Sequence, residues 1–334
     1  MLTLEPVTSS GYAEEYKAKK QFFDQRREYN AILAQEARSE HLADIIREAA
    51  QQMNAERPLE FDGCNLSLMT GREGVLILSD WHYGMVANNI WNQFNVQICR
   101  ARVRYVVERA VKQIREHGVN TLHVVILGDM AAGAIHTSAR VASEEDVCDQ
   151  LMHVSELLAE SIAELSNYVG KTYVYSTYGN HMRTVASFKD SIHEDNMEKI
   201  IPWWLRWRLI ECDSIEIIDS DAHEFIRLSV CGENLLATHG DLDSDKQAAI
   251  RLNTLHEKLY GEGIDYLLTA HVHHVEGCET LGIEHIQVGC LCGTDEYAKT
   301  KRLYSLPSQT MLIYDPVYGL DSVCNIRLDS KKGM

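Results

Sequence analysis

Five short hydrophobic runs of this chain are each followed by polar residues of the types that bind metal ions. In chain order, the motifs are Asp80-Trp81-His82, Gly128-Asp129, Gly179-Asn180-His181, His239-Gly240-Asp241 and His271-Val272-His273. Runs of β-branched and aliphatic residues are typical of buried strands. Ligands of open α/β sheets bind beyond the carboxyl ends of the strands. The repeated pattern therefore predicts that distant parts of the chain meet at one edge of a sheet.

The order of hydrophobic patterns along the chain predicts the fold class. Between residues 75 and 177, three expected strands alternate with amphipathic segments at residues 96–117 and 144–168. A mostly helical region is expected up to residue 210, and further strands cluster between residues 215 and 327 around one helix at 244–260. This order predicts an α/β (α+β) fold in which a mixed sheet, or two packed sheets, has helices outside.

The N-terminal part of the chain reads as helical. Residues 12–53 contain no proline or glycine and carry a rough apolar stripe at helical spacing, which includes Phe22, Tyr29 and Leu33. We expect one long helix or two shorter ones, followed by a linker near Pro58, so that residues 1–60 form an extension and residues 61–334 the main domain. The helix either belongs to its own domain or forms a homo-oligomer through a second copy.

Composition limits the location and the partners. No apolar stretch reaches the ~18 residues of a membrane span, and no signal peptide opens the chain. The nine cysteines form no regular framework, and the spacing of Cys290 and Cys292 fits neither a zinc knuckle nor a redox pair. We therefore expect reduced thiols and a cytoplasmic protein. The formal net charge of −17 argues against a long duplex-binding tract but not against a nucleotide or a short nucleic-acid end.

The motif residues suit a site with two metal ions. In an extended chain, residues i and i+2 point the same way, so Asp80 and His82 would reach one ion. A single carboxylate such as Asp129 can bridge two cations about 3.5–4 Å apart. Asn180 offers a neutral oxygen, and His181 could donate a proton. Mixed Asp, His and Asn ligands suit borderline-hard divalent metals.

The complete set of motifs resembles the calcineurin-like metallophosphoesterases, whose pattern is D-x-H, G-D, G-N-H, H and G-H-x-H in this order. The resemblance implies a four-layer fold with a central β-sandwich flanked by helices. It implies the following metal ligands: Asp80, His82 and His273 for one ion, Asn180, His239 and His271 for the other, and Asp129 as the bridge. It also implies that His181 is the catalytic residue that protonates the leaving oxygen. Manganese is the favoured metal by this resemblance, with iron, zinc and nickel as alternatives.

The local sequence is also similar to narrower groups within this family. The segment from Ser79 to Gly84 resembles the opening motif of SbcD-type DNA repair nucleases, and the contexts of the second and third motifs resemble phage- and prophage-encoded members. A phage-encoded protein would act in the host cytoplasm. Three departures stand out: Met182 replaces the usual acidic residue after Gly-Asn-His, Ala270 replaces a glycine, and Gly128-Asp129 lacks the protein-phosphatase continuation.

The expected activity is hydrolysis of a phosphodiester bond, most favourably in nucleic acid or nucleotides, by a hydroxide that bridges two divalent metal ions. A small-molecule phosphomonoesterase or cyclic-nucleotide phosphodiesterase is the alternative, and a metal-bound scaffold protein is an alternative of another class. Arg183, His136 and Arg140 are candidate substrate-binding residues. Asp241 is a candidate for orienting a neighbouring metal ligand.

Overall fold

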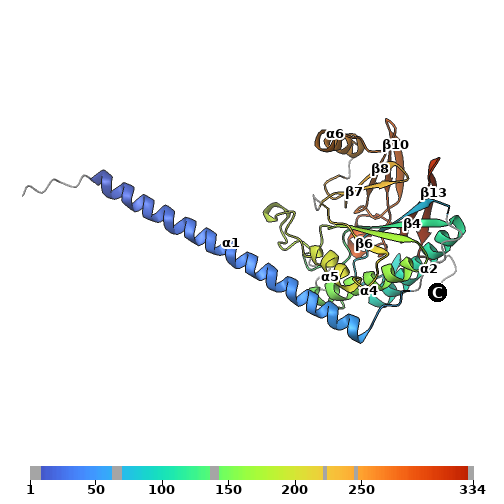
Figure 1. Ribbon diagram of the computed structural model, residues 1–334, viewed down its shortest axis with the longest axis horizontal. Helices are drawn as coiled ribbons and strands as arrows, with labels where there is room; N and C mark the ends of the chain where they lie inside the picture. Colours follow the sequence, from blue (N-terminus) through green and yellow to red (C-terminus); the bar gives the residue numbers. More distant parts are fainter. Residues whose placement is uncertain (1–8, 62–69, 136–142, 221–223, 244–246, 330–334) are drawn as a thin grey trace, which may run out of the picture. The chain divides into compact units, whose positions relative to one another are not determined.

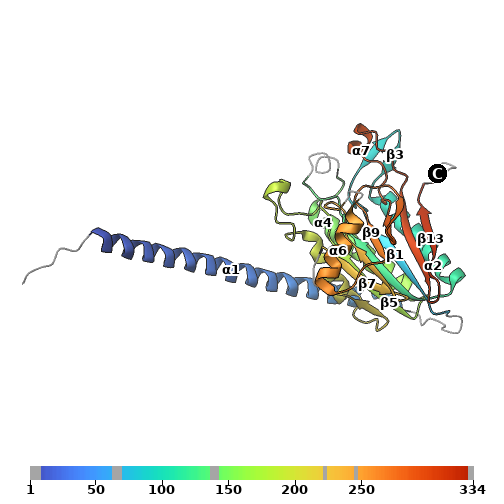
Figure 2. The same cartoon turned by 90° about the horizontal axis from the view of Figure 1, so that it is seen from above.

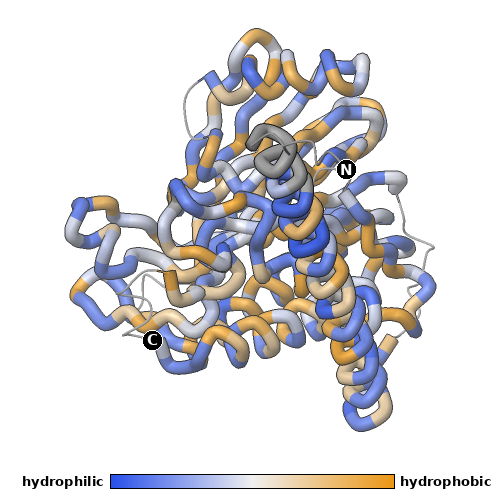
Figure 3. Tube along the Cα trace, turned by 90° about the vertical axis from the view of Figure 1, so that its left-hand side faces the viewer, coloured by the Kyte–Doolittle hydropathy of each residue, from blue (hydrophilic) through white to orange (hydrophobic). Residues whose placement is uncertain are grey.

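The computed structural model describes residues 9–61, 70–135, 143–220, 224–243 and 247–329. The chain divides into two compact units, residues 1–53 and 54–334. Residues 9–53 of the first unit belong to α1 (Ser9–Glu56), which is one unbroken helix rather than two. Hydrophilic and hydrophobic residues are interspersed along it (Figure 3).

The larger unit contains two main sheets. The first sheet has the strand order β13-β12-β1-β4-β5-β6, in which β1, β4, β5 and β6 are parallel neighbours and β12 and β13 run antiparallel. Its strands are β1 (Arg72–Leu78), β4 (Val119–Leu127), β5 (Lys171–Thr177), β6 (Ile215–Ile217), β12 (Ser308–Asp315) and β13 (Gly319–Arg327).

The second sheet has the order β10-β11-β9-β8-β7, with β8, β9 and β11 as parallel neighbours between antiparallel edge strands. Its strands are β7 (Ile226–Val230), β8 (Glu233–Ala237), β9 (Tyr266–Thr269), β10 (Glu276–Thr280) and β11 (Ile283–Gln287). A separate hairpin consists of β2 (Ala87–Asn89) and β3 (Asn92–Phe94), and it lies beside the short helix α7 (Glu296–Thr300) (Figure 2).

Helices cover the outer faces of both sheets (Figure 1). Three helices, α2, α4 and α5, pack on the first sheet, and α6 covers the second sheet. The helices of this unit are α2 (Val96–His117), α4 (Val147–Ser166), α5 (Ile200–Arg208), α6 (Ala248–Tyr260) and α7 (Glu296–Thr300), with 3₁₀ turns η2 (Phe188–Asp190) and η3 (Met197–Lys199). The expected β-sandwich flanked by helices, a four-layer arrangement, is confirmed.

The alternation of side chains along β1 and β4 builds two cores at once. Leu76 and Leu78 of β1 pack with the helices on the outer face, while Val75 and Ile77 point into the core between the sheets. Successive side chains of a strand point to opposite faces of the sheet. A strand whose two faces are both covered therefore has apolar residues at successive positions. This explains why these strands read as continuous hydrophobic runs rather than as alternating ones.

Two expectations about secondary structure were wrong. The region after β5 was expected to be mostly helical, but residues 178–196 are largely irregular, and the helix α5 begins only at Ile200. The strands β2, β3 and β10 were not expected. The short strands β2 and β3 and the exposed strand β10 lack the buried hydrophobic run on which strand prediction relies.

The fully buried side chain of Gln309 on β12 secures the turn that follows β1. Its Oε1 accepts hydrogen bonds from the backbone N–H of Ser79 and the indole N–H of Trp81, both at 3.0 Å. Its Nε2 donates to the carbonyl of Ser79 at 3.1 Å. The position of Asp80, between Ser79 and Trp81, is therefore fixed by a strand that runs antiparallel to β1.

We predict that Gln309→Leu destabilises the protein by about 2–4 kcal/mol, because two buried N–H donors lose their acceptor. Chemical denaturation of the purified variant measures the free energy of unfolding. The matched control is Gln93→Leu at an exposed position of β3, where we expect a change within about 0.5 kcal/mol. Equal stability of the two variants would contradict this account of Gln309.

Candidate metal centre

The turns after β1 and β4 run side by side and carry the first two motifs. The backbone N–H of Asp80 donates to the carbonyl of Gly128 at 3.1 Å, and that of His82 donates to Asp129 at 3.0 Å. The turns after β5, β8 and β9 reach the same place, since their residues bond to these two turns. The five motifs therefore converge as predicted, although they follow strands of both sheets and not the strands of one sheet.

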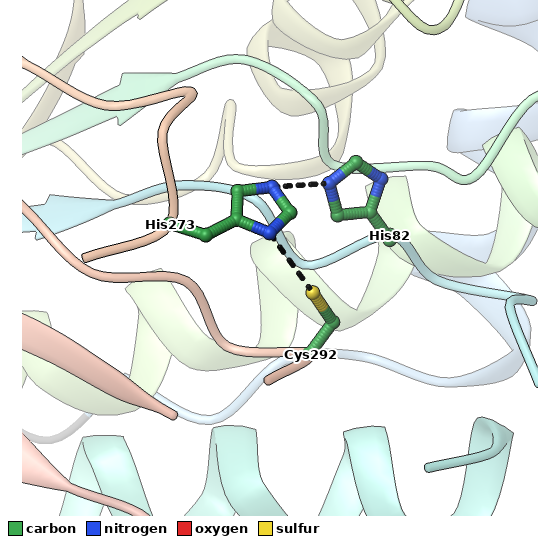
Figure 4. Close-up of side chains that lie close together, drawn as sticks. All are labelled: His82, His273 and Cys292. Carbon is green, nitrogen blue, oxygen red and sulfur yellow. Dashed lines mark hydrogen bonds between the residues drawn. The ribbon is translucent and has the colours of Figure 1, made fainter. Parts of the chain in front are cut away.

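A first cluster of side chains contains Asp80, His82 and His273. The Nε2 atoms of the two histidines lie 3.2 Å apart (Figure 4). Each also faces Oδ1 of Asp80, at 3.7 Å for His82 and 3.3 Å for His273. This carboxylate oxygen is buried and has no hydrogen-bond partner among the described residues. A buried oxygen that faces two imidazole nitrogens fits a site for a cation.

A second cluster contains Asp129, Asn180, His239 and His271. Nε2 of His239 lies 3.3 Å from Oδ2 of Asp129 and 3.4 Å from Oδ1 of Asn180. Asp129, His239 and His271 each offer a ligand atom within 4.8 Å of the others. Asp129 forms a further such group with His82 and His181, so it lies between the two clusters. The donors of both clusters are of the types that hold divalent metals.

The backbone at these positions is strained in a way the sequence did not reveal. Among the described residues, eight that are not glycine have a positive φ, and five of them are predicted ligands. These five are Asp80 (φ 50), His82 (φ 45), Asp129 (φ 52), His271 (φ 67) and His273 (φ 65). Residues with side chains rarely adopt this conformation, and it gathers at functional sites.

The extended geometry expected for Asp80 and His82 is therefore wrong, although both reach one cluster. Their left-handed conformation bends the chain at each residue, so a two-residue spacing does not by itself put neighbours on one side. His271 and His273 show the consequence, because they have the same spacing and lie in different clusters. The backbone turns sharply at the predicted ligands and does not continue the extended conformation of the preceding strand.

Two glycines allow the turns after β4 and β5 to touch. A Cβ atom on Gly128 would lie 2.2 Å from the backbone nitrogen of Gly179. A Cβ atom on Gly179 would lie 2.1 Å from Oδ1 of Asp129. Neither position has room for any side chain, so glycine is required at both.

His181 lies at the edge of the centre, with its side chain 20% exposed. Its Nδ1 lies 2.9 Å from the carbonyl of Ala132, so Nδ1 carries a proton and donates it there. Its Nε2 lies 3.9 Å from Oδ2 of Asp129, and its ring meets that of His82 edge-on. Nε2 is the ring nitrogen that faces Asp129 and the clusters, so it is the atom placed to exchange a proton with a bound molecule.

A backbone group orients the imidazole of His239 with Nε2 toward the second cluster. Its Nδ1 lies 2.7 Å from the carbonyl of Leu127 and donates to it, which leaves the lone pair of Nε2 for the cluster. Burial acts to lower the pKa of His239, but the Asp129 carboxylate raises it to about 10. Burial acts to raise the pKa of Asp129, but the charges of His181 and His239 hold it well below its usual range. The metal-free cluster is thus a network of paired charges.

Sequence reasoning missed two residues of this region, Cys292 and Glu198. The buried Sγ of Cys292 lies 4.0 Å from Nδ1 of His273, the ring nitrogen that does not face His82 (Figure 4). Cys292 follows the hydrophobic stretch that ends at Val288, so its place after a strand was a usable signal. Together with His82 and His273 it forms a third group that could hold a metal ion.

Glu198 is buried behind the turns and accepts hydrogen bonds from their backbone. Burial and the charge of Asp129 raise the pKa of Glu198 to about 7, while the N–H groups of Gly179 and Met130 favour its charged form. It comes from a region that was expected to be helical, and no motif marked it.

The remaining candidate residues are placed as follows. The guanidinium of Arg183 donates to carbonyls of its own loop, those of Asn180, Val185 and Ala186. Oδ2 of Asp241 lies 3.5 Å from Nε2 of His193. His136 and Arg140 lie outside the described residues. The roles assigned to all four from the sequence stay predictions.

Comparisons with known proteins give one curated relative and several solved structures. No protein-family model matches the chain. The chain is 26% identical over 289 residues to the SPbeta prophage-derived uncharacterized protein YonJ of Bacillus subtilis (strain 168), covering 83% of this chain and 69% of that protein.

Among solved structures, the chain is similar to a novel archaeal phosphodiesterase, with a TM-score of 0.38 and 16% identity over 76% of this chain and 99% of the other. It is also similar to Vps29 of Entamoeba histolytica complexed with zinc, with a TM-score of 0.34 and 13% identity over 77% of this chain and 99% of the other. A third similar structure is that of a predicted phosphoesterase of Streptococcus pneumoniae TIGR4, with a TM-score of 0.33 and 10% identity over 77% of this chain and 98% of the other.

We predict that metal binding releases protons at neutral pH. His239 is protonated in the metal-free protein because its pKa is raised to about 10, and a metal ligand must be a neutral imidazole. The apparent affinity of the protein for Mn²⁺ should therefore rise with pH up to about 10, and it should fall at acidic pH, where His239 keeps its proton. Calorimetric titration of metal-free protein with Mn²⁺, in two buffers of different ionisation enthalpy, measures the number of protons released.

The variant His239→Ala should release about one proton fewer than the unchanged protein. The matched control is His123→Ala, because His123 is also buried but pairs with Glu73. It should leave the proton release unchanged. Binding heats that do not depend on the buffer would contradict the prediction.

Proposed function

We propose that this chain is a calcineurin-like, metal-dependent phosphoesterase that binds two divalent cations. The observation that carries the proposal is the gathering of strained, left-handed backbone at five residues whose side chains form two adjoining Asp/His clusters. Such strain persists only where the surrounding structure enforces it, and it is characteristic of functional sites. The unpartnered oxygen of Asp80 supports a cation there.

The proposed ligands are those assigned from the sequence. One ion would be held by Asp80, His82 and His273, the other by Asn180, His239 and His271, with Asp129 between them. Two such cations, when bound, neutralise phosphoryl charge and lower the pKa of a water molecule. Manganese stays the favoured metal by the family resemblance, and the donor set also accepts iron, zinc or nickel.

The protein itself supplies a proton donor. Nδ1 of His181 is committed to the carbonyl of Ala132, which holds the ring with Nε2 directed toward Asp129 and the clusters. In its protonated form, His181 would give the Nε2 proton to the leaving oxygen. This proton matters most when the leaving group is an alkoxide, as in a nucleic-acid or nucleotide diester.

The favoured substrate is a phosphodiester in nucleic acid or a nucleotide. The prophage origin of the relative supports the resemblance to phage-encoded members, and with it the host cytoplasm as location. The preference for nucleic acid rests on the resemblance of residues 79–84 to the SbcD-type nucleases. No helix in the described part of the chain is long and apolar enough to cross a membrane. We also propose that the boundary between the N-terminal extension and the main domain lies between residues 60 and 61. The N-terminal helix would form a homo-oligomer with a second copy of the chain.

We predict that the protein loaded with Mn²⁺ cleaves phosphodiesters. Single-stranded DNA, double-stranded DNA, cyclic nucleotides and p-nitrophenyl phosphate, assayed side by side, measure the preference. Cleavage of the monoester alone would favour the small-molecule phosphomonoesterase, and cleavage of cyclic nucleotides alone the cyclic-nucleotide enzyme. Cleavage of none would overturn the proposal and favour a metal-bound scaffold.

We predict that His181→Ala lowers the rate on alkyl diesters by about 10²–10⁴-fold, because the leaving alkoxide loses its proton donor. A p-nitrophenyl ester should lose less, since its leaving group needs no proton, and Mn²⁺ binding should persist. The control is His153→Ala, whose half-exposed imidazole pairs with Glu145. Parallel losses on both leaving groups would rule out this role for His181.

A further inference from the structure

The carboxylate of Glu198 joins the two glycine-containing turns of the centre. Its Oε1 accepts the backbone N–H groups of Met130 at 2.6 Å and Ala131 at 3.4 Å. Its Oε2 accepts those of Asp129 at 3.1 Å and Gly179 at 2.7 Å. The residue is only 3% exposed, so these four N–H groups replace water around the carboxylate. One side chain therefore binds the backbone of both turns.

The neighbouring Asn196 completes this attachment. Its Nδ2 donates to the carbonyl of Gly179 at 2.7 Å, and its Oδ1 accepts the backbone N–H of Glu198 at 3.0 Å. Both backbone groups of Gly179 are thus bound by the segment 196–198. Asn196 is itself buried, so the segment forms a fixed support behind the turn after β5.

We propose that Glu198 is a positioning residue that sets the geometry of the second metal site, the one formed by Asp129, Asn180, His239 and His271. This inference rests on the proposed function. The two turns that Glu198 joins carry Asp129 and Asn180, whereas the first cluster takes Asp80 and His273 from the turns after β1 and β9. Loss of the carboxylate should therefore disturb the second site more than the first.

In this arrangement, both terminal atoms of the side chain at position 198 must be hydrogen-bond acceptors. Each carboxylate oxygen of Glu198 faces two N–H donors. A glutamine has one oxygen and one NH₂ group, so in either orientation its NH₂ would meet two N–H groups. The turn on that side must move, and its metal ligand moves with it. An aspartate keeps both acceptors but is shorter by one methylene.

The test is calorimetric titration of the metal-free full-length protein with Mn²⁺. For Glu198→Gln we expect one of the two binding steps to weaken by about 10–100-fold, the range for residues that orient metal ligands. The other step should stay within a few-fold of the unchanged protein. Glu198→Asp should recover part of the lost affinity, which a purely space-filling role would not produce. Circular dichroism establishes that each variant is folded.

The matched control is Glu156→Gln. The Glu156 carboxylate binds the buried guanidinium of Arg208, at 3.0 Å from Oε2 to Nε, outside the metal centre. We expect this variant to melt at a lower temperature and to bind Mn²⁺ unchanged. Two unchanged binding steps in Glu198→Gln, or an equal loss in Glu156→Gln, would overturn the inference alone. Failure of the unchanged protein to bind Mn²⁺ would overturn the proposed function and this inference together.

Discussion

The contact between the Gly128 and Gly179 turns is the constraint on which the rest of the centre depends. With no side chain at either glycine, the carboxyl ends of β4 and β5 approach until the backbone of one turn meets that of the other. Oδ1 of Asp129 then accepts the backbone N–H of His181 at 2.8 Å, which leaves Oδ2 to face the clusters. The proposed bridging carboxylate and the proposed proton donor are thus positioned by the same contact.

Electrostatics explains why this arrangement calls for a cation. Asp80 and Asp129 are buried carboxylates, and buried charges are costly unless they are paired and hydrogen-bonded. The imidazoles around them provide part of the pairing, but the Nε2 atoms of His82 and His273 face one another at 3.2 Å and share the same carboxylate oxygen. One shared proton can satisfy only one of these contacts. A divalent cation satisfies all of them at once.

The layers of the fold could be predicted from the sequence because each buried strand is a hydrophobic run and each outer helix an amphipathic one. The parallel direction of β1, β4 and β5 in one sheet, and of β8 and β9 in the other, puts the motifs of each sheet at one edge. That the two edges meet is a result of how the sheets pack, which the sequence pattern does not contain. The left-handed backbone at Asp80 and His82 could not be predicted, because the tertiary contacts of the turns enforce it against local preference. Cys292 and Glu198 could not be assigned to the centre from the sequence, because they stand outside the contiguous motifs.

Met182 shows how far a contiguous motif can be trusted. Its presence after Asn180-His181 looks like the loss of the acidic residue that the family pattern has there. In the folded chain, however, the carbonyl of Met182 accepts the backbone N–H of Met197 at 2.9 Å, which brings the segment after Asn196 alongside this turn. That segment delivers the carboxylate of Glu198 to the backbone of Gly179. A carboxylate is therefore present at the turn, supplied by tertiary contact from a later part of the chain.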